Sequence, residues 1–302
     1  MWPRDIDWRS LRFGVEIEFV GIAPEAVERL DGWSVDPRER MRALDGSYGG
    51  GEIKSPPVDW SQRGQIETMM ARIETAGASV NWSCGFHVHV GLEPWGVDAL
   101  PALLDAALTT QTALRELFQT PSHRLIFCPP VTRAQRDAWL AAPCEDALCH
   151  VGRPQGHRSG INLAAWYEFG TVELRFANGT LDADRAQRSV ELALRWVAAV
   201  GRGAALPGER EALVAALEVA AEGYPPPHPE PVWHAREEQL SALMIPILQP
   251  QITAEVPDAE ILWVRPTPEG LYVKTDSGDR CNHRFWFEPH AQGFRLLRFE
   301  KA

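Results

Sequence analysis

Hydrophobic residues recur along the chain with two different spacings, and each spacing predicts one kind of element. Alternation at every second residue is typical of a strand, whose successive side chains point to opposite faces of a sheet. It predicts strands at 12–20, twice within 44–55 around a Gly-rich turn, at 86–92, and as a hairpin-like pair at 161–164 and 171–176. Apolar residues three and four positions apart are typical of a helix. They predict helices at 61–77, 98–119, 132–141, 182–200, 208–222 and 234–248.

Two stretches interrupt this pattern. The region 120–160 is irregular, so we expect loops around the helix at 132–141, and long insertions of this kind are often functional. The segment 224–231, YPPPHPEP, contains too much proline for a helix or a strand. It is predicted to be a turn or a linker.

The pattern changes again towards the C-terminus. From Ile252 onward, four short alternating runs are separated by Gly, Pro and Asp, which predicts a small antiparallel β appendage. We interpret four of its aromatic residues as parts of its own small core: Trp263, Phe285, Trp286 and Phe287. We therefore expect an α+β protein with a main domain over 1–249 and the appendage over 250–302.

Composition and charge exclude some classes of protein. Among 302 residues, 45% are hydrophobic and 24% charged, which is ordinary for a globular protein. The net charge of −11 argues against a nucleic acid partner held by a basic surface. The N-terminus lacks the apolar core of a signal peptide, and no apolar run is long enough to span a membrane. We expect a cytoplasmic protein with no membrane partner.

The cysteines favour neither disulfides nor a structural zinc site. There are five of them, an odd number without close Cys-x-x-Cys spacing. Cys128, Cys144, Cys149 and His150 can be combined into a zinc site on paper. Free thiols are the interpretation that we favour.

Three predicted strands each carry a pair of polar side chains two residues apart. The pairs are Glu16 with Glu18, His87 with His89, and Glu173 with Arg175. Residues i and i+2 of a strand share a face, and an unpaired ionised group on a hydrophobic face would cost several kcal/mol. We therefore expect the three pairs to line one cavity that binds metal and an anion.

The candidate ligands are mostly carboxylates, which favours magnesium or manganese over structural zinc. The candidates are Glu16, Glu18, Glu52, Glu173 and His87, with Asp45 nearby in the sequence. Two or three Mg²⁺ ions held there would neutralise the phosphates of a nucleotide, and Arg175 would stabilise charge on a transferring phosphoryl group. Each pair alone has a simpler interpretation: a solvated strand face for the glutamates, a chance occurrence for the histidines, and a surface ion pair for Glu173 and Arg175.

The order of the motifs resembles a known family. FGVEIEF, DGSYGGGEIKSPP, CGFHVHVG and INL…GTVELRFANGTL are similar to the amidoligases, within the glutamine synthetase and glutamate–cysteine ligase superfamily of carboxylate–amine ligases. The resemblance covers roughly residues 10–200. It implies a curved antiparallel sheet with helices on its outer face. ATP and two or three Mg²⁺ (or Mn²⁺) ions would bind in the concave cup, where a carboxylate is activated as an acyl phosphate and captured by an amine.

The resemblance also implies individual roles. Metal ligands would be Glu16, Glu18, Glu52, His87 and Glu173. Asp45 would bind metal or the incoming amine, His89 would approach the nucleotide phosphates, and Arg175 would contact the phosphoryl group. Arg158 and Asn162 would either position the acceptor carboxylate or brace the hairpin.

Two other functions use the same residues. A phosphotransferase of the guanidino-kinase type would use the same cup and stop after phosphorylating a nitrogen. A non-catalytic module would bind metal or nucleotide only. For a ligase we expect small-molecule or peptide carboxylate and amine substrates, and the oligomeric state stays open.

Overall fold

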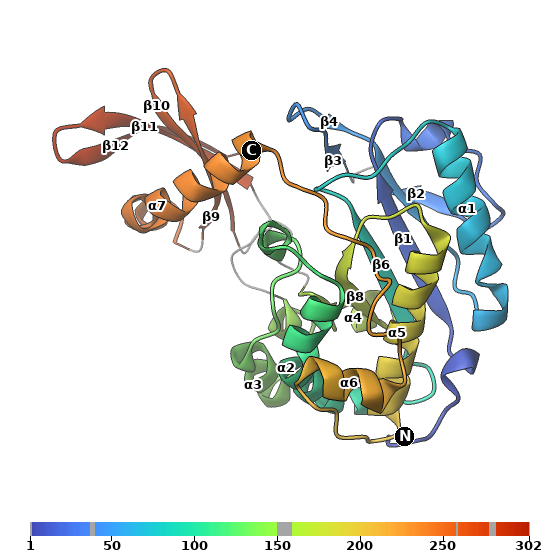
Figure 1. The fold of residues 1–302 in the computed structure, drawn as a ribbon. Helices are drawn as coiled ribbons and strands as arrows, with labels where there is room; N and C mark the ends of the chain where they lie inside the picture. Colours follow the sequence, from blue (N-terminus) through green and yellow to red (C-terminus); the bar gives the residue numbers. More distant parts are fainter. Residues whose placement is uncertain (1, 37–39, 150–158, 258, 278–281, 302) are drawn as a thin grey trace. The chain divides into compact units, whose positions relative to one another are not determined.

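The computed structural model describes residues 2–36, 40–149, 159–257, 259–277 and 282–301. Contacts between Cα atoms divide the chain into two compact units (Figure 1). Among the described residues, the first comprises those within 2–149 and 159–229, and the second those within 230–301. The boundary at Pro229 and Glu230 lies within the proline-rich segment 224–231.

The first unit is built on a six-stranded sheet in the order β2-β5-β1-β6-β8-β7, in which every neighbouring pair is antiparallel. Its strands are β1 (Phe13–Phe19), β2 (Ser34–Asp36), β5 (Gly51–Lys54), β6 (Gly85–Gly91), β7 (Ile161–Asn162) and β8 (Thr171–Asn178). A separate small hairpin joins β3 (Met41–Arg42) to β4 (Tyr48–Gly49). The helices of this unit are α1 (Gly64–Thr75), α2 (Leu100–Leu117), α3 (Arg133–Ala141), α4 (Ala165–Phe169), α5 (Ala183–Gly201) and α6 (Arg210–Leu217).

One face of this sheet is hydrophobic and packs against helices. On β1 the odd-numbered residues Phe13, Val15 and Ile17 are buried in one core with apolar residues of α1, α2 and α5. Helix α5 packs on β6, and Figure 1 shows it running along the sheet. Because side chains alternate along a strand, the even-numbered Glu16 and Glu18 lie on the opposite face.

The predicted mixture of helices and antiparallel strands is confirmed, with local differences. Glu218 adopts a left-handed backbone conformation (φ 53°) and ends α6 at Leu217, so the helix predicted to reach residue 222 is shorter. The two short strands predicted within 44–55 exist as β4 and β5, but they do not pair with each other. Between them Gly50 has a positive φ of 66°, where L residues are disfavoured, and β5 pairs with β1 and β2 instead.

The second unit contains α7 (Val232–Glu255) and a four-stranded antiparallel sheet in the order β12-β11-β10-β9. Its strands are β9 (Glu260–Thr267), β10 (Gly270–Asp276), β11 (Asn282–His290) and β12 (Gly293–Lys301). The predicted C-terminal antiparallel sheet is therefore confirmed. Met244, Leu248 and Ile252 of α7 pack in one core with residues of this sheet, so the helix belongs to this unit although the sequence analysis placed residues up to 249 with the main domain.

Only two of the four aromatic residues expected in the core of the C-terminal sheet lie in that core, because side chains alternate between the two faces of its strands. Phe285 and Phe287 are buried in the core. Trp263 and Trp286 are half-buried and both contact Tyr272 instead. Among the helices in the described part of the chain, none is both long and apolar enough to cross a bilayer.

A single methyl group tests the packing of the hydrophobic face. A Cβ atom at Gly201, the last residue of α5, would overlap the indole ring of Trp95, which is 1% exposed and donates from Nε1 to the carbonyl of Arg4. Overpacking of this kind typically costs about 1–3 kcal/mol. We expect Gly201→Ala to lower the urea midpoint of the first unit accordingly. Gly64→Ala, at an exposed position with no atom within 4 Å of the added carbon, should leave it unchanged or raise it. Equal midpoints for the two variants would contradict this packing.

Candidate functional site

The strand register brings the polar pairs of separate motifs side by side on the face opposite the helices. Glu16 on β1 lies opposite Lys54 on β5 and His87 on β6. One row away, Glu18 lies opposite Glu52. At the other side, His89 lies opposite Glu173 on β8, which in turn lies opposite Asn162 on β7. Directly opposite side chains are within contact distance, so the register alone assembles one polar surface across five strands.

A bulge between β6 and β8 places Arg175 beside His87. Phe86 pairs with Ala177 and Val88 with Leu174, so that two residues of β8 lie opposite His87 alone. Nη1 of Arg175 is 3.4 Å from Nδ1 of His87 and also forms an ion pair with Oε1 of Glu173. Arg175 is 7% exposed and thus belongs to the interior of the site.

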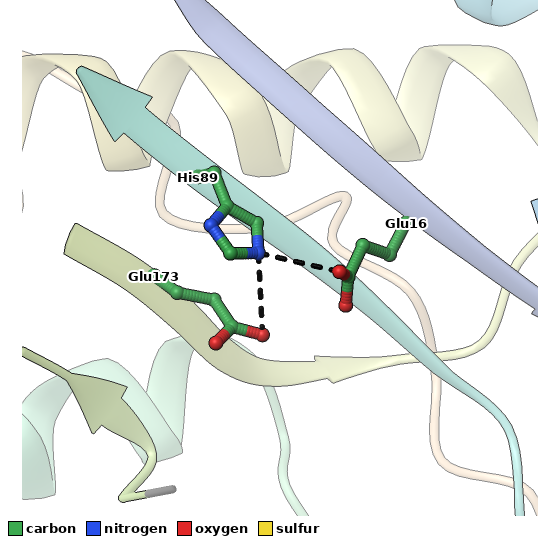
Figure 2. Close-up of side chains that lie close together, drawn as sticks. All are labelled: Glu16, His89 and Glu173. Atoms are coloured by element: carbon green, nitrogen blue, oxygen red, sulfur yellow. Dashed lines mark ion pairs between the residues drawn. The ribbon is translucent and has the colours of Figure 1, made fainter. Parts of the chain in front are cut away.

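Glu16, His89 and Glu173 form the first of two groups with the geometry of metal ligands (Figure 2). Nε2 of His89 lies 3.4 Å from Oε1 of Glu16 and 3.6 Å from Oε1 of Glu173, and it makes no hydrogen bond. Its other ring nitrogen, Nδ1, contacts the hydroxyl of Thr171 at 3.0 Å, which orients the ring. The imidazole therefore presents one unsatisfied nitrogen to two carboxylates.

Glu16, Glu52 and His87 form the second group. Oε2 of Glu16 is 2.9 Å from Nδ1 of His87. All three residues are at most 4% exposed. Nζ of Lys54 lies 3.0 Å from Glu16 and 2.9 Å from Glu52, so one ammonium offsets part of their negative charge. Glu16 is common to both groups and joins them.

The electrostatics of the site are those of buried carboxylates held close together. Burial raises the pKa of Glu52 well above its ordinary value, and the charges of Glu16 and Glu18 raise it further. Burial also opposes ionisation of Glu16, but its contacts with His87 and His89 hold its pKa well below the ordinary value. Cations bound here would relieve the repulsion that acts on Glu52.

Glu173 is kept ionised in spite of its burial. Desolvation opposes its charge, but the adjacent Arg175 lowers its pKa to about 2. Burial likewise disfavours protonation of His89, yet the carboxylates of Glu173 and Glu16 raise its pKa. A divalent ion held between Glu16 and Glu173 would offset the same negative charge.

The two groups fit a hard divalent cation. Their donors are carboxylate oxygens and imidazole nitrogens with no thiolate, a set suited to Mg²⁺ or Mn²⁺. Around an octahedral Mg²⁺ ion, neighbouring ligand atoms are about 3 Å apart. The separations of 3.4 and 3.6 Å around Nε2 of His89 need only small side-chain adjustments to reach that spacing.

A cavity of about 320 Å³ opens beside the first group. It shares Glu16, His89 and Lys54 with the acidic cluster and continues past Gly14 and Gly91. Both glycines are two residues from a site residue on their strands and so lie on the same face, where the carboxylate of Glu93 lies against Gly91. The remaining lining residues are Arg12, Phe13, Val15, Ser34, Ser55, Pro57, Glu93, Phe169 and Thr171.

Two other residues predicted from the sequence to belong to the site lie next to the metal-ligand groups. Glu18 borders the second group without belonging to it: Oε2 accepts a hydrogen bond from the backbone N–H of Gly85, and Oε1 is 3.6 Å from Nε2 of His87. Asn162 donates to Oε2 of Glu173 at 2.7 Å and thus braces a candidate ligand.

Asp45 is not part of the cluster. It is exposed in the turn between β3 and β4, where its carboxylate accepts bonds from the backbone and hydroxyl of Ser47. Those bonds lower its pKa. Arg158 and His150 lie outside the described residues. The candidate metal groups of the described chain contain no cysteine, and Cys84 and Cys128 are buried free thiols.

Lys54 is the main site residue that the sequence analysis missed. It follows Glu52 by two residues on a strand, so the rule that grouped Glu16 with Glu18 applies to it equally. Although burial favours the neutral amine, Glu16 and Glu52 raise its pKa, and Asp36 on β2 adds a third carboxylate at 3.4 Å. Thr171, which orients His89, was missed too, although it precedes Glu173 by the same spacing.

Sharing of Glu16 between the two groups has a measurable consequence. Loss of a group that only supports a metal ligand typically weakens binding 10- to 100-fold, so loss of a ligand should cost at least roughly 10-fold. We expect Glu16→Gln to weaken Mn²⁺ binding at both groups and His89→Gln at one only, as measured by calorimetry or by the electron paramagnetic resonance of free Mn²⁺. Glu67→Gln, exposed on α1, is the matched control. Unaltered Mn²⁺ binding by the Glu16 variant would exclude this site.

Comparison with known proteins assigns the chain to a family. No curated protein matches it. A family model described as "Putative amidoligase enzyme" matches residues 33–197. The match begins after β1 but includes β5, β6 and β8, which supply the other acidic and imidazole groups of the site. Since it spans more than half of the 302 residues, the chain belongs to this amidoligase family and is a ligase-type enzyme.

Proposed function

We propose that the protein is an ATP-dependent carboxylate–amine ligase that forms an amide or isopeptide bond through an acyl phosphate, on a sheet of the glutamine synthetase type. The observation that carries the proposal is the row of buried carboxylates and imidazoles on the sheet face opposite the helices, next to a cavity. Phosphoryl transfer from ATP depends mainly on positioning and on neutralising phosphate charge, and this face offers groups for both.

The metal ions would be Mg²⁺ or Mn²⁺. Glu16, His89 and Glu173 would hold one ion, and Glu16, Glu52 and His87 another, with Glu18 beside the second. When bound, such ions offset the negative charge of the phosphates and orient them. The ligase family, the oxygen-rich donor set and the unsatisfied Nε2 of His89 support this assignment.

The cavity beside His89 is the proposed nucleotide site. Its 320 Å³ is in the range of small-molecule pockets. Phe169, which meets the His89 ring edge-on, provides an aromatic wall. A nucleotide here would direct its phosphates towards His89 and Glu16, in agreement with the role that the sequence motif implies for His89.

The reaction would proceed in two steps. An oxygen of the substrate carboxylate attacks the γ-phosphorus of ATP, and the bond to ADP breaks. The nitrogen of the amine then attacks the carbonyl carbon, inorganic phosphate leaves, and the nitrogen loses a proton. Arg175 would face the charge on the transferring phosphoryl group. The ion pair with Glu173 and the bulge in β8 hold Arg175 in place.

Product analysis tests the proposed reaction. We expect release of ADP and inorganic phosphate when the protein is incubated with MgATP, a panel of amino and dicarboxylic acids, and hydroxylamine as a small amine. Hydroxylamine converts an acyl phosphate to a hydroxamate, which a ferric salt reveals. Mn²⁺ should replace Mg²⁺, and Zn²⁺ should not, because the donors are mostly carboxylates. ADP without free phosphate would instead indicate a kinase, and ATP binding without turnover would indicate a binding module.

Substitution of Arg175 separates catalysis from binding. Arg175→Lys keeps a positive charge but loses the planar two-point contact. Turnover should fall roughly 10- to 1,000-fold, the effect of removing one transition-state contact worth about 2–4 kcal/mol, while MgATP affinity changes far less. Glu173→Gln should weaken metal-dependent binding as well as turnover, since a ligand is lost. Wild-type turnover by folded Arg175→Lys would show that Arg175 only completes an ion pair.

A further inference from the structure

Arg124 is a buried cation that forms no ion pair with any residue that the structure describes. It lies in the short 3₁₀ helix η5 (Ser122–Ile126) and is 3% exposed. Its Nη1 donates to the carbonyl of Cys84, while Nε has no hydrogen-bond partner. Within the described part of the chain, no carboxylate pairs with its guanidinium.

Two other cations beside the metal-ligand groups are paired. Arg175 contacts Glu173, and Lys54 contacts Glu16 and Glu52. Burying a charged group without a partner costs several kcal/mol, so a buried arginine with unused donors indicates an anion that the free protein lacks. The position of Arg124 shows where such an anion would bind.

Gly85, at the start of β6, is the point where Arg124 reaches the site. A Cβ atom there would lie 2.5 Å from Nη2 of Arg124, 2.7 Å from Nε2 of His87 and 3.3 Å from Oε2 of Glu18. The guanidinium is therefore directly above Gly85, on the same face as the metal-ligand groups. Only glycine leaves space for this approach.

One donor of the Arg124 guanidinium faces the metal-ligand groups. Nη1 is occupied by the carbonyl of Cys84 and Nε is enclosed by protein, whereas Nη2 lies over Gly85. A charge-assisted hydrogen bond from Nη2 to a carboxylate oxygen is among the stronger kinds of hydrogen bond.

Arg124 and the nucleotide cavity lie at opposite ends of the metal-ligand groups. Along β6 the residues of this face are Gly85, His87, His89 and Gly91; the cavity borders the last two, and Arg124 lies over the first. Gly85 and His89 are four residues apart, about 13 Å along a strand. A nucleotide in the cavity would thus point its phosphates towards the metals from one side, and a second substrate would approach from the side of Arg124.

We propose that Arg124 binds the substrate carboxylate that is to be activated, through Nη2 of its guanidinium. The inference rests on the proposed function, and it adds a residue that neither the family match nor the motifs indicate. Arg124 lies near the start of the region 120–160 that the sequence predicts to be irregular. Bound to Arg124, the acceptor carboxylate lies beside Glu18 and His87, on the side of the metals away from the nucleotide base.

Kinetics of Arg124 variants test the proposal in the hydroxamate assay. Arg124→Gln should raise the half-saturating concentration of the carboxylate roughly 10- to 100-fold, the effect of losing charged hydrogen bonds, and leave that of MgATP within about 3-fold. Arg124→Lys keeps the positive charge but not the guanidinium nitrogen over Gly85, so it should give an intermediate half-saturating concentration of the carboxylate. Arg185→Gln, a surface arginine paired with Asp182, is the control. An unchanged carboxylate dependence in Arg124→Gln with active enzyme would overturn the inference and leave the ligase function standing.

A second measurement does not require turnover. With Mg²⁺ and a non-hydrolysable ATP analogue present, acetate, malonate, succinate and glutarate are added at constant ionic strength and the melting temperature is recorded. At least one acid should stabilise the wild-type protein and Arg185→Gln but not Arg124→Gln. If no acid supports ATP turnover but this dependence is seen, the ligase function fails and Arg124 remains a carboxylate site. If only inorganic phosphate gives the Arg124-dependent shift, or no acid does, the inference fails.

Gly85→Ala provides an independent variant should Arg124 substitutions prevent folding. The added methyl group would displace Nη2 of Arg124 while the arginine remains, so the carboxylate dependence should weaken as in Arg124→Gln. It would also press on Nε2 of His87, so Mn²⁺ binding at the second group should weaken with it. A carboxylate half-saturation within 2-fold of the wild-type value in Gly85→Ala would contradict the geometry on which the proposal rests.

Discussion

Mutual repulsion among buried carboxylates is the constraint on which the first unit depends. Glu16, Glu18, Glu52 and Glu173 are each at most 8% exposed and lie within one network of contacts. Such a group is stable only when cations are interleaved with the acids. Lys54 and Arg175 provide part of that charge from the protein itself, and the unsatisfied Nε2 of His89 indicates where more is required. Metal binding and the integrity of the sheet are thus coupled through the same residues.

The sheet fixes the positions of these charged groups relative to one another. Each strand contributes polar residues at alternate positions, and antiparallel pairing aligns them in rows. The bulge in β8 adds Arg175 to the row of His87, because the extra residue shifts the strand locally. Helices on the opposite face bury the intervening apolar residues, such as Val15 and Ile17, and hold the rows rigid. The same alternation therefore defines the core and the site.

The sequence predicted which residues share a face far better than which strands are neighbours. Glu16 and Glu18, or His87 and His89, can be assigned to one face from spacing alone, whereas the adjacency of β1 to β6 and of β6 to β8 depends on long-range pairing that no local pattern encodes. Asp45 was grouped with the acids because it is close to Glu52 in sequence, but a separate hairpin holds it at the surface. Periodicity predicted α7 without showing on which sheet it packs. Arg124 comes from a region without periodicity, so only the fold reveals it.

The order of strands has a consequence for the synthesis of the protein. β1 is made first yet occupies an inner position, and its neighbour β6 arrives more than sixty residues later. β8, with Glu173 and Arg175, follows after a further eighty or so residues. Contacts this distant in sequence form slowly. A nascent chain thus carries Glu16 and Glu18 long before Arg175 can balance them, and the site is completed only when β8 docks against β6. Until β8 has left the ribosome, solvent has to offset the charge that Arg175 balances in the finished sheet.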